Sequence, residues 1–484
     1  MSLLCGLRRP LPPTARAALL ASLLLASSAG AQLAPPVLTP AAAAPTVAAA
    51  SIATLTAAAA PWLSFSRAFD AALGYDAQFD AARHERDVTQ GGVPVAFAAL
   101  LPTLNLSLSD SRSIGTREFP NSLNQQVTLD VDYKSPQAVL QLRAPLFNYE
   151  ALSRYRQAKA QAEGADSVYQ SRGADLLDRL SVAFLQQMLA DENVRQAQVQ
   201  AAWLAAQLER VTQRLQRGEG TRIETADAQA QLDLARAKLL DARDLAVVAR
   251  RGLARITGLQ ADRLPPIDDK LPTPPLQPQS LIEWQTLALR NNASIRAREQ
   301  SVEVARQGVQ RNRAGHLPRL DMVASLSKNS NESLANLNQS SRLANVGLQL
   351  NVPLYSGGGV QASIKQAQSD VLRTEAELSN ERRNVELEVQ RQFLAATHGQ
   401  ERIQAYVQAV ASSEVVLEGV TRGVAAGIRS ASEVLEAGAR LQLARRDLAQ
   451  ARVEYLLART RLMAQSGAAP VDVVADIDRL LSMR

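Results

Sequence analysis

Side chains able to perform chemistry are few and scattered in this chain of 484 residues. The three histidines, His84, His316 and His398, stand far apart, and the single cysteine, Cys5, lies near the N-terminus. No spacing typical of a metal site is present, and no nucleophile, base and orienting acid recur together. We therefore expect no catalysis, no metal and no cofactor, and we assign His316 a structural role at a helix-to-strand junction.

Two pairs of acids have a spacing worth interpreting. Glu433 and Glu436 are three positions apart, so on a helix both carboxylates point down one face. Acids at the start of a helix also complement its dipole, and Glu224 and Asp227 could do so at an equivalent place earlier in the chain. The segment 356–359, Ser-Gly-Gly-Gly, precedes a helix but lacks the lysine of a phosphate loop, which indicates a bend instead.

The elements that position these acids are long helices with heptad spacing, and they occur twice. A constant offset of 209 positions places Gly218 on Gly427 and Gly258 on Gly467, which indicates a duplicated architecture. On each helix the apolar heptad residues form a narrow, alanine-rich stripe, and a stripe of this kind packs against other helices. The first stripe comprises Leu232, Ala235, Leu239, Ala242, Ala246, Ala249, Leu253 and Ile256, and the second comprises Ala437, Leu441, Ala444, Leu448, Ala451, Tyr455, Ala458 and Leu462.

Composition supports extended helices over a thick globular core, because only 4% of the residues are aromatic. Residues 1–31 read as a secretory signal cleaved before Gln32, since the apolar run is too short for a membrane anchor. Residues 32–62 are rich in alanine and proline and should be an unfolded leader. The small positive charge, formally +6 for the whole chain, gives no reason to expect a nucleic-acid partner.

The remaining sequence divides into two repeats of the same plan. Prolines at 102, 145, 318 and 353 mark the expected junctions between helices and strands. We expect a first repeat at 63–260 (helix 66–99, strands 103–113 and 136–145, helices 149–217 and 221–258), a proline-rich linker at 261–280, a second repeat at 281–467 (helix 281–314, strands 318–328 and 343–353, helices 360–424 and 430–466), and a C-terminal tail at 468–484.

All four expected strands have one fully apolar face and one face of small polar side chains. Leu104, Leu106 and Leu108 alternate with polar residues in the first strand, for example. A single strand of this kind also suits a soluble sandwich, but four of them in a secreted chain favour an outer-membrane barrel. Four strands cannot close a barrel, and open edges in lipid leave backbone groups unpaired, so three or more copies should assemble.

Several motifs of this sequence are similar to those of the TolC family of outer-membrane channel-tunnel proteins. They are the runs Gly315-His316-Leu317-Pro318-Arg319-Leu320-Asp321, Val352-Pro353-Leu354-Tyr355-Ser356-Gly357-Gly358, Lys365-Gln366-Ala367-Gln368, and Gly427-Ile428-Arg429 followed by Glu433-Val434-Leu435-Glu436. The resemblance implies an α+β homotrimer: a twelve-stranded barrel in the outer membrane, continued by a long α-helical barrel across the periplasm. It also implies docking to a periplasmic adaptor and an inner-membrane ABC or RND transporter.

The same resemblance implies a gate at the periplasmic helix turns, where Gly218 and Gly427 lie. Glu433 and Glu436 match the family's acidic ring, which in three copies would favour cations. Arg429 matches an arginine that latches the closed state, with Glu224 and Asp227 on the acidic side of the latch. Val424 replaces the family's tyrosine, so part of that network is missing.

A periplasmic adaptor or structural coiled-coil protein of an envelope-spanning complex is the alternative, because adaptors also carry heptads. Such a protein would lack four alternating strands at matched positions in a duplicated plan. Whether the cargo is drugs, as in multidrug efflux, or proteins, as in type I secretion, is not decided by the small polar lining of the expected tunnel.

Overall fold

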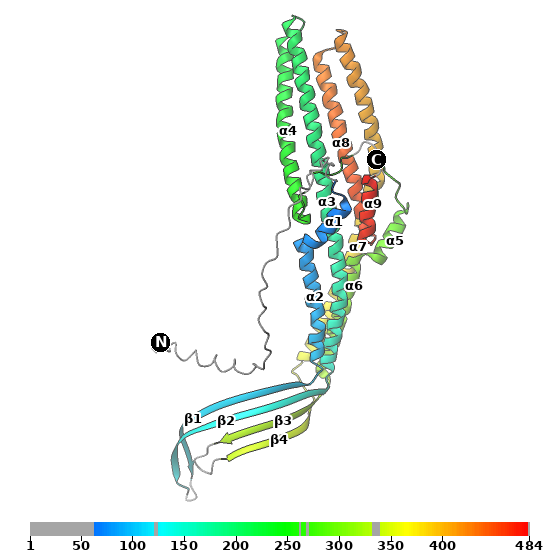
Figure 1. Ribbon diagram of the computed structural model, residues 1–484. Helices are drawn as coiled ribbons and strands as arrows, with labels where there is room; N and C mark the ends of the chain where they lie inside the picture. The colour runs from blue at the N-terminus through cyan, green and yellow to red at the C-terminus, as the bar shows by residue number, and fades with distance from the viewer. Residues whose placement is uncertain (1–61, 121–123, 261–262, 268–270, 332–338, 483–484) are drawn as a thin grey trace, which may run out of the picture. The chain divides into compact units, whose positions relative to one another are not determined.

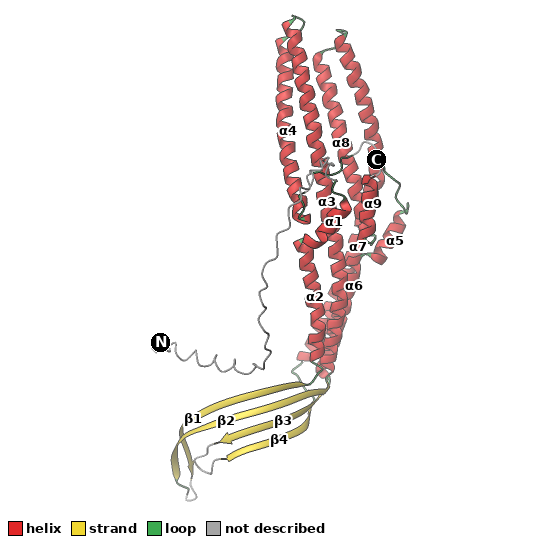
Figure 2. Cartoon of the chain, viewed as in Figure 1, coloured by secondary structure: helices red, strands yellow, loops and turns green. Residues whose placement is uncertain are grey.

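The computed structural model describes residues 62–120, 124–260, 263–267, 271–331 and 339–482 (Figures 1 and 2). The expected signal and all of the expected leader except Trp62 lie outside these residues. The elements are α1 (Phe65–Tyr75), α2 (Ala77–Ala98), β1 (Thr103–Pro120), β2 (Gln126–Phe147), α3 (Tyr149–Gln216), α4 (Arg222–Thr257), α5 (Leu281–Asn291), α6 (Ala293–Arg313), η2 (Ala314–His316), β3 (Arg319–Asn331), β4 (Gln339–Asn351), α7 (Gly359–Ala425), α8 (Ala431–Gln465) and α9 (Pro470–Ser482).

The expected helices at 66–99 and 281–314 are each interrupted by one polar residue. Asp76 leaves helical geometry, and its Oδ1 accepts from the backbone N–H of Phe79 at 2.8 Å, so it ends α1 and caps α2. Asn292 does the same between α5 and α6, accepting from the Ser294 N–H at 2.9 Å. The single-helix prediction was wrong because the apolar spacing continues through both caps, whose side chains satisfy the exposed N–H groups.

The four strands form one antiparallel sheet in the order β1-β2-β3-β4. β1 and β2 extend well beyond the expected 103–113 and 136–145, since their ladder continues to the pair Pro120 and Gln126. In β1 the apolar alternation stops near Ser109, so periodicity did not reveal its outer half, whereas in β2 the alternation of Val127, Leu129 and Val131 was a signal that the expected bounds left out. Pro145 also does not end β2: it lies inside the strand, at a register irregularity before Phe147, where a residue without an N–H is tolerated.

One face of the sheet is apolar across all four strands. A row of facing residues consists of Leu106, Leu140, Leu326 and Ala344. Leu106 is 64% exposed, and Val346 and Leu348 on β4 are also largely exposed. The opposite face carries Ser107, Gln141 and other polar residues. A contiguous leucine-rich surface left exposed by the chain's own fold must be covered by something outside it.

The long helices pair as two antiparallel hairpins, α3 with α4 and α7 with α8. α3 has 68 residues and α7 has 67, which at ~1.5 Å per residue makes each about 100 Å long. Residues of both heptad stripes are buried between the helices, among them Leu232 and Leu253 on α4 and Leu441 and Leu462 on α8. None of the helices in the described ranges has the length and hydrophobicity that a membrane crossing requires.

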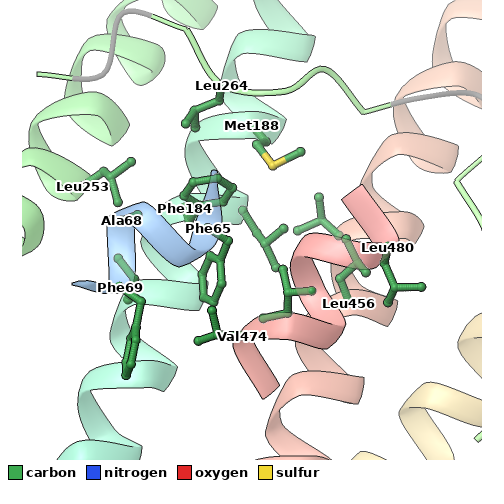
Figure 3. Packing of buried hydrophobic residues seen from close by; sticks show 14 of the residues in the cluster. Phe65, Ala68, Phe69, Phe184, Met188, Leu253, Leu264, Leu456, Val474 and Leu480 are labelled. Atoms are coloured by element: carbon green, nitrogen blue, oxygen red, sulfur yellow. The ribbon is translucent and has the colours of Figure 1, made fainter. Parts of the chain in front are cut away.

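The largest apolar core joins α1, α3, α4, α8 and α9 (Figure 3). Phe65 of α1 meets Phe184 of α3 edge to face, with ring centroids 5.3 Å apart. Val474 and Leu480 of α9 are buried in the same cluster. The expected C-terminal tail at 468–484 contains α9, a helix that the sequence analysis did not predict: its apolar residues recur on one helical face, and this face packs into the core.

Candidate functional site

The candidate site lies at the turns that connect the helices of each hairpin, and the two turns have the same backbone structure. Gly218 and Gly427 adopt positive φ values of 79° and 75°. After α3, the N–H groups of Gly218 and Glu219 donate to the carbonyls of Leu215 and Arg214. After α7, Gly427 and Ile428 donate to Val424 and Gly423 in the same pattern. This pair of bonds is the Schellman motif, which needs a left-handed residue and therefore favours glycine.

The returning helices also begin in the same way. Thr221 caps α4: its hydroxyl accepts from the Glu224 N–H at 3.2 Å, and the Glu224 carboxylate accepts from the Thr221 N–H at 3.0 Å. At the start of α8, the Glu433 carboxylate accepts from the Ser430 N–H at 3.1 Å. Glu224 and Glu433, at equivalent positions of the duplication, therefore both bind the backbone of their own turn as in a capping box.

Arg429 distinguishes the second turn from the first, where the equivalent residue is Gly220. Its Nη1 donates to Oε2 of Glu433 at 2.7 Å, on the same helix end. The stem of Arg429 lies over Gly423, where an added Cβ would come within 2.7 Å of Cγ of the arginine. The bond from Arg429, followed by the bonds from Ser430, lowers the pKa of Glu433 from 4.5 to about 2. Glu433 is therefore ionised, and the guanidinium of Arg429 partly compensates its negative charge.

Several predicted site residues form no bond with Arg429 among the described residues of one chain. Glu436 is 76% exposed and lies 3.6 Å from Arg440, a loose surface pair. Asp227 is exposed on α4, and no bond joins it or Glu224 to Arg429 within the described part of one chain. Glu433 and Glu436 share a helix end, as their spacing indicates, but Glu433 is held closely by Arg429 at 2.7 Å, whereas Glu436 has only the loose contact with Arg440. Val424 contributes its carbonyl to the turn.

A contact between the two hairpins near these turns is not apparent from the sequence patterns. The ring of Trp203 on α3 lies against Gly438 on α8, where an added Cβ would stand 2.4 Å from Cη2 of the indole. Leu435 of α8 packs beside it against the cluster of Leu204 and Leu232. An isolated glycine inside a helical heptad is the signal that could have indicated this close approach.

Asp321 is a second residue that the patterns did not reveal, at the helix-proximal end of β3. It is 2% exposed, and its carboxylate accepts from Arg143 of β2 at 2.7 Å and from Arg319 at 3.0 Å. Pro318 directly precedes β3. Pro102 and Pro353 lie just before β1 and just after β4, in the connections to the helices.

The connection from β4 to α7 bends through Gly357 and Gly358, whose φ values are 59° and 77°. His316 ends the short helix η2, and Leu317 and Pro318 connect it to β3. Within the described residues, no group of three or more histidines, cysteines or acids is placed to hold a metal.

An amphipathic antiparallel sheet whose strands lead directly into two duplicated hairpins of ~100 Å helices defines the subunit of an outer-membrane channel. The chain belongs to the outer membrane efflux protein family, whose model matches residues 68–259 and 284–468. These two segments coincide with the two repeats. The protein is located in the outer membrane and extends into the periplasm, where it serves as an exit duct of a transport system.

Individual relatives agree with this placement. The chain is similar to the proteases secretion protein PrtF of Dickeya chrysanthemi, with 34% identity over 86% of this chain and 90% of the relative. It is also similar to the alkaline protease secretion protein AprF of Pseudomonas aeruginosa, with 33% identity over 82% of both chains. Among solved structures, CusC shares the fold with a TM-score of 0.73 at 16% identity, covering 84% of this chain and 92% of that one.

Proposed function

We propose that three copies of this chain form the outer-membrane duct of a type I secretion system that exports proteases. The open sheet is the observation that supports the trimer. β1 and β4 each expose one edge, in a sheet whose leucine face suits contact with lipid. Unpaired backbone groups at such an edge are too costly in hydrocarbon, so each β4 pairs with β1 of another copy. Three copies give twelve strands, enough for a water-filled lumen.

The cargo is proposed from the relatives' names, since both PrtF and AprF are described as protease secretion proteins. An adaptor in the periplasm and an ABC transporter in the inner membrane would supply the energy and select the cargo. A duct lined by small polar side chains, such as Ser107 and Gln141, holds a passing chain weakly and suits an unfolded polypeptide. An RND transporter and drug cargo are the alternative arrangement.

The helix turns would form the gate at the periplasmic end of this duct. Repeated three times, Glu436 places a ring of solvated carboxylates at the mouth, which favours cations. Arg429 compensates Glu433, so the effective charge of the ring comes mainly from Glu436. We propose that Arg429 holds the closed state through Glu433 and through acids of a neighbouring hairpin, with Glu224 and Asp227 as the candidates.

Deletion of the chromosomal gene, followed by complementation, tests the cargo. We expect the deletion strain to lose extracellular protease while the same protease accumulates inside the cell, and drug susceptibility to remain unchanged. Complementation with the wild-type chain should restore export. Unchanged protease export together with raised drug susceptibility would refute protein secretion in favour of efflux. Assembly is tested separately, by the heat-sensitive migration of an outer-membrane trimer in gel electrophoresis.

A further inference from the structure

A pair of cations borders the apolar face of the sheet on its outer side. Lys328 on β3 and Arg342 on β4 are directly opposite in the register, and both are exposed. Their row across the sheet consists of Leu108, Ala138, Lys328 and Arg342, and the next row toward the helices consists of Leu106, Leu140, Leu326 and Ala344. Successive rows on one face share an orientation, so the cations point to the same side as the leucines.

The height of this pair along the strand matches the outer boundary of a bilayer. From Arg319 to Lys328, β3 rises by about 30 Å at ~3.4 Å per residue. With a strand tilt of about 40°, this spans roughly 23 Å, close to the ~25 Å apolar band of outer-membrane barrels. Because the helices leave the opposite ends of the strands, Lys328 and Arg342 lie at the level of the outer-leaflet headgroups.

The two cations oppose each other without an acid between them. Like charges directly across a ladder repel and destabilise the pairing. In contrast, Arg112 on the same face forms two bonds with Asp132, at 2.7 and 2.5 Å. Among the described residues, neither Lys328 nor Arg342 forms an ion pair. The cationic pair is therefore unbalanced within the described part of the chain, and an anion has to be supplied from outside it.

A hollow beside the cations adds a requirement for an apolar group on the same ligand. It has a volume of about 400 Å³ and is lined by Leu106, Leu140, Leu326 and Ala344 together with Lys328 and Arg342. A ligand that fills it contacts hydrocarbon side chains at one end and two cations at the other. That chemistry describes a lipid with an acyl chain and a phosphate.

We propose that Lys328 and Arg342 form a binding site for the phosphate of an outer-leaflet lipid, whose acyl chain lies in the adjoining hollow. Bidentate donation by Arg342 and the ammonium of Lys328 would hold the phosphate at the headgroup level. Basic pockets at membrane boundaries recognise anionic headgroups in this manner. The inference rests on the outer-membrane location and the proposed lipid-facing orientation of the sheet, and it is independent of cargo.

The test uses the full-length trimer in detergent and two probes, lipid A with both phosphates and the same lipid A after their removal. For wild type, we expect the phosphorylated probe to bind at least tenfold more tightly than the dephosphorylated one, by native mass spectrometry. The double variant Lys328→Gln, Arg342→Gln should lose this preference. Exchange of the two cations, Lys328→Arg with Arg342→Lys, should retain it.

The matched control removes two cations from a helix outside the membrane, Lys238→Gln with Arg243→Gln on α4, and should leave lipid binding unchanged. Equal binding of both probes by wild type, or an unchanged preference in the double variant, would overturn the lipid site. Inorganic phosphate that competes as strongly as the lipid would also overturn it, since the hollow would then play no part. A wild-type chain that forms no conducting trimer would instead refute the proposed duct.

Discussion

The indole of Trp203 on α3 rests on the bare backbone of Gly438 on α8, and this contact ties the two hairpins of one chain together near their turns. The indole ring occupies the space that a side chain at position 438 would need. Elsewhere on α7, Gly419 has open space around it. The two glycines therefore offer a direct comparison between a helical glycine required by packing and one that is not.

Gly438→Ala should destabilise the hairpin contact, because the new methyl would overlap Trp203. Overpacking of this kind typically costs about 1–3 kcal/mol. We expect a lower melting temperature of the trimer in detergent, measured by the loss of heat-modified migration. Gly419→Ala is the control and should be neutral or slightly stabilising, by up to ~1 kcal/mol. Equal effects of the two substitutions would show that Trp203 readily moves aside.

Arg429→Ser should raise single-channel conductance in planar bilayers and also increase cation selectivity. The substitution removes the cation that compensates Glu433 and releases the arginine stem from Gly423. Solvent screens an exposed pair, so we expect the conductance to rise by no more than about fivefold. Arg422→Ser, close by on α7, is the control. Unchanged conductance would remove Arg429 from the gate.

Glu436→Ala should reduce cation preference and block by multivalent cations more than Glu433→Ala does. Glu433 already faces Arg429 at 2.7 Å, whereas Glu436 has only a loose contact with Arg440. Reversal potentials in a salt gradient measure this difference. The double substitution should largely abolish the preference. If Glu433→Ala has the larger effect, the carboxylate exposed to the pore is the other one.

The Arg429–Glu433 pair should resist moderate acid. Glu433 has a folded-state pKa of about 2, below its ordinary value of 4.5. The stabilisation by this pair is therefore fully present above pH 4.5 and is lost as the pH falls through about 2. The conductance ratio of Arg429→Ser to wild type should be the same at pH 7 and pH 5 and should approach one only as the pH falls below about 2. A ratio that reaches one at pH 5 would contradict the lowered pKa.

Asp478→Ala should weaken the attachment of α9. The carboxylate of Asp478 accepts from the N–H groups of Phe65 and Ser66 at 2.8 and 3.0 Å, so the last helix caps the first. Loss of a helix cap costs about 1–2 kcal/mol. Thermal unfolding of the trimer measures it. Asp472→Ala, exposed at the start of α9, should have a smaller effect, and comparable losses would argue against the cap.

The sequence patterns predicted features that repeat or alternate. Offsets between glycines indicated the positions of both turns, and Gly218 and Gly427 do adopt the left-handed conformation. Alternating leucines indicated the face of the sheet that is apolar. These signals are local, and each depends on one physical period or one backbone requirement.

Features that depend on a distant partner were not predictable in this way. Asp76 and Asn292 interrupt helices because their side chains cap the next one, while the apolar spacing continues unchanged. The buried Asp321 takes one of its two cations, Arg143, from the neighbouring strand, far away in the sequence. The bond from Arg429 to Glu433 on its own helix was not indicated either, since the resemblance pointed to acids of another hairpin, and that latch stays a prediction.

The two turns, each closed by a Schellman motif and a glutamate cap, have a mechanical consequence. The Schellman bonds and the glutamate caps join residues of the same turn, so displacing a hairpin sideways breaks none of these bonds. Flexing therefore concentrates where helices touch one another, as at Trp203 and Gly438. We therefore expect a hairpin of this construction to move as a stiff unit, so that a small rotation at its base displaces its tip farthest.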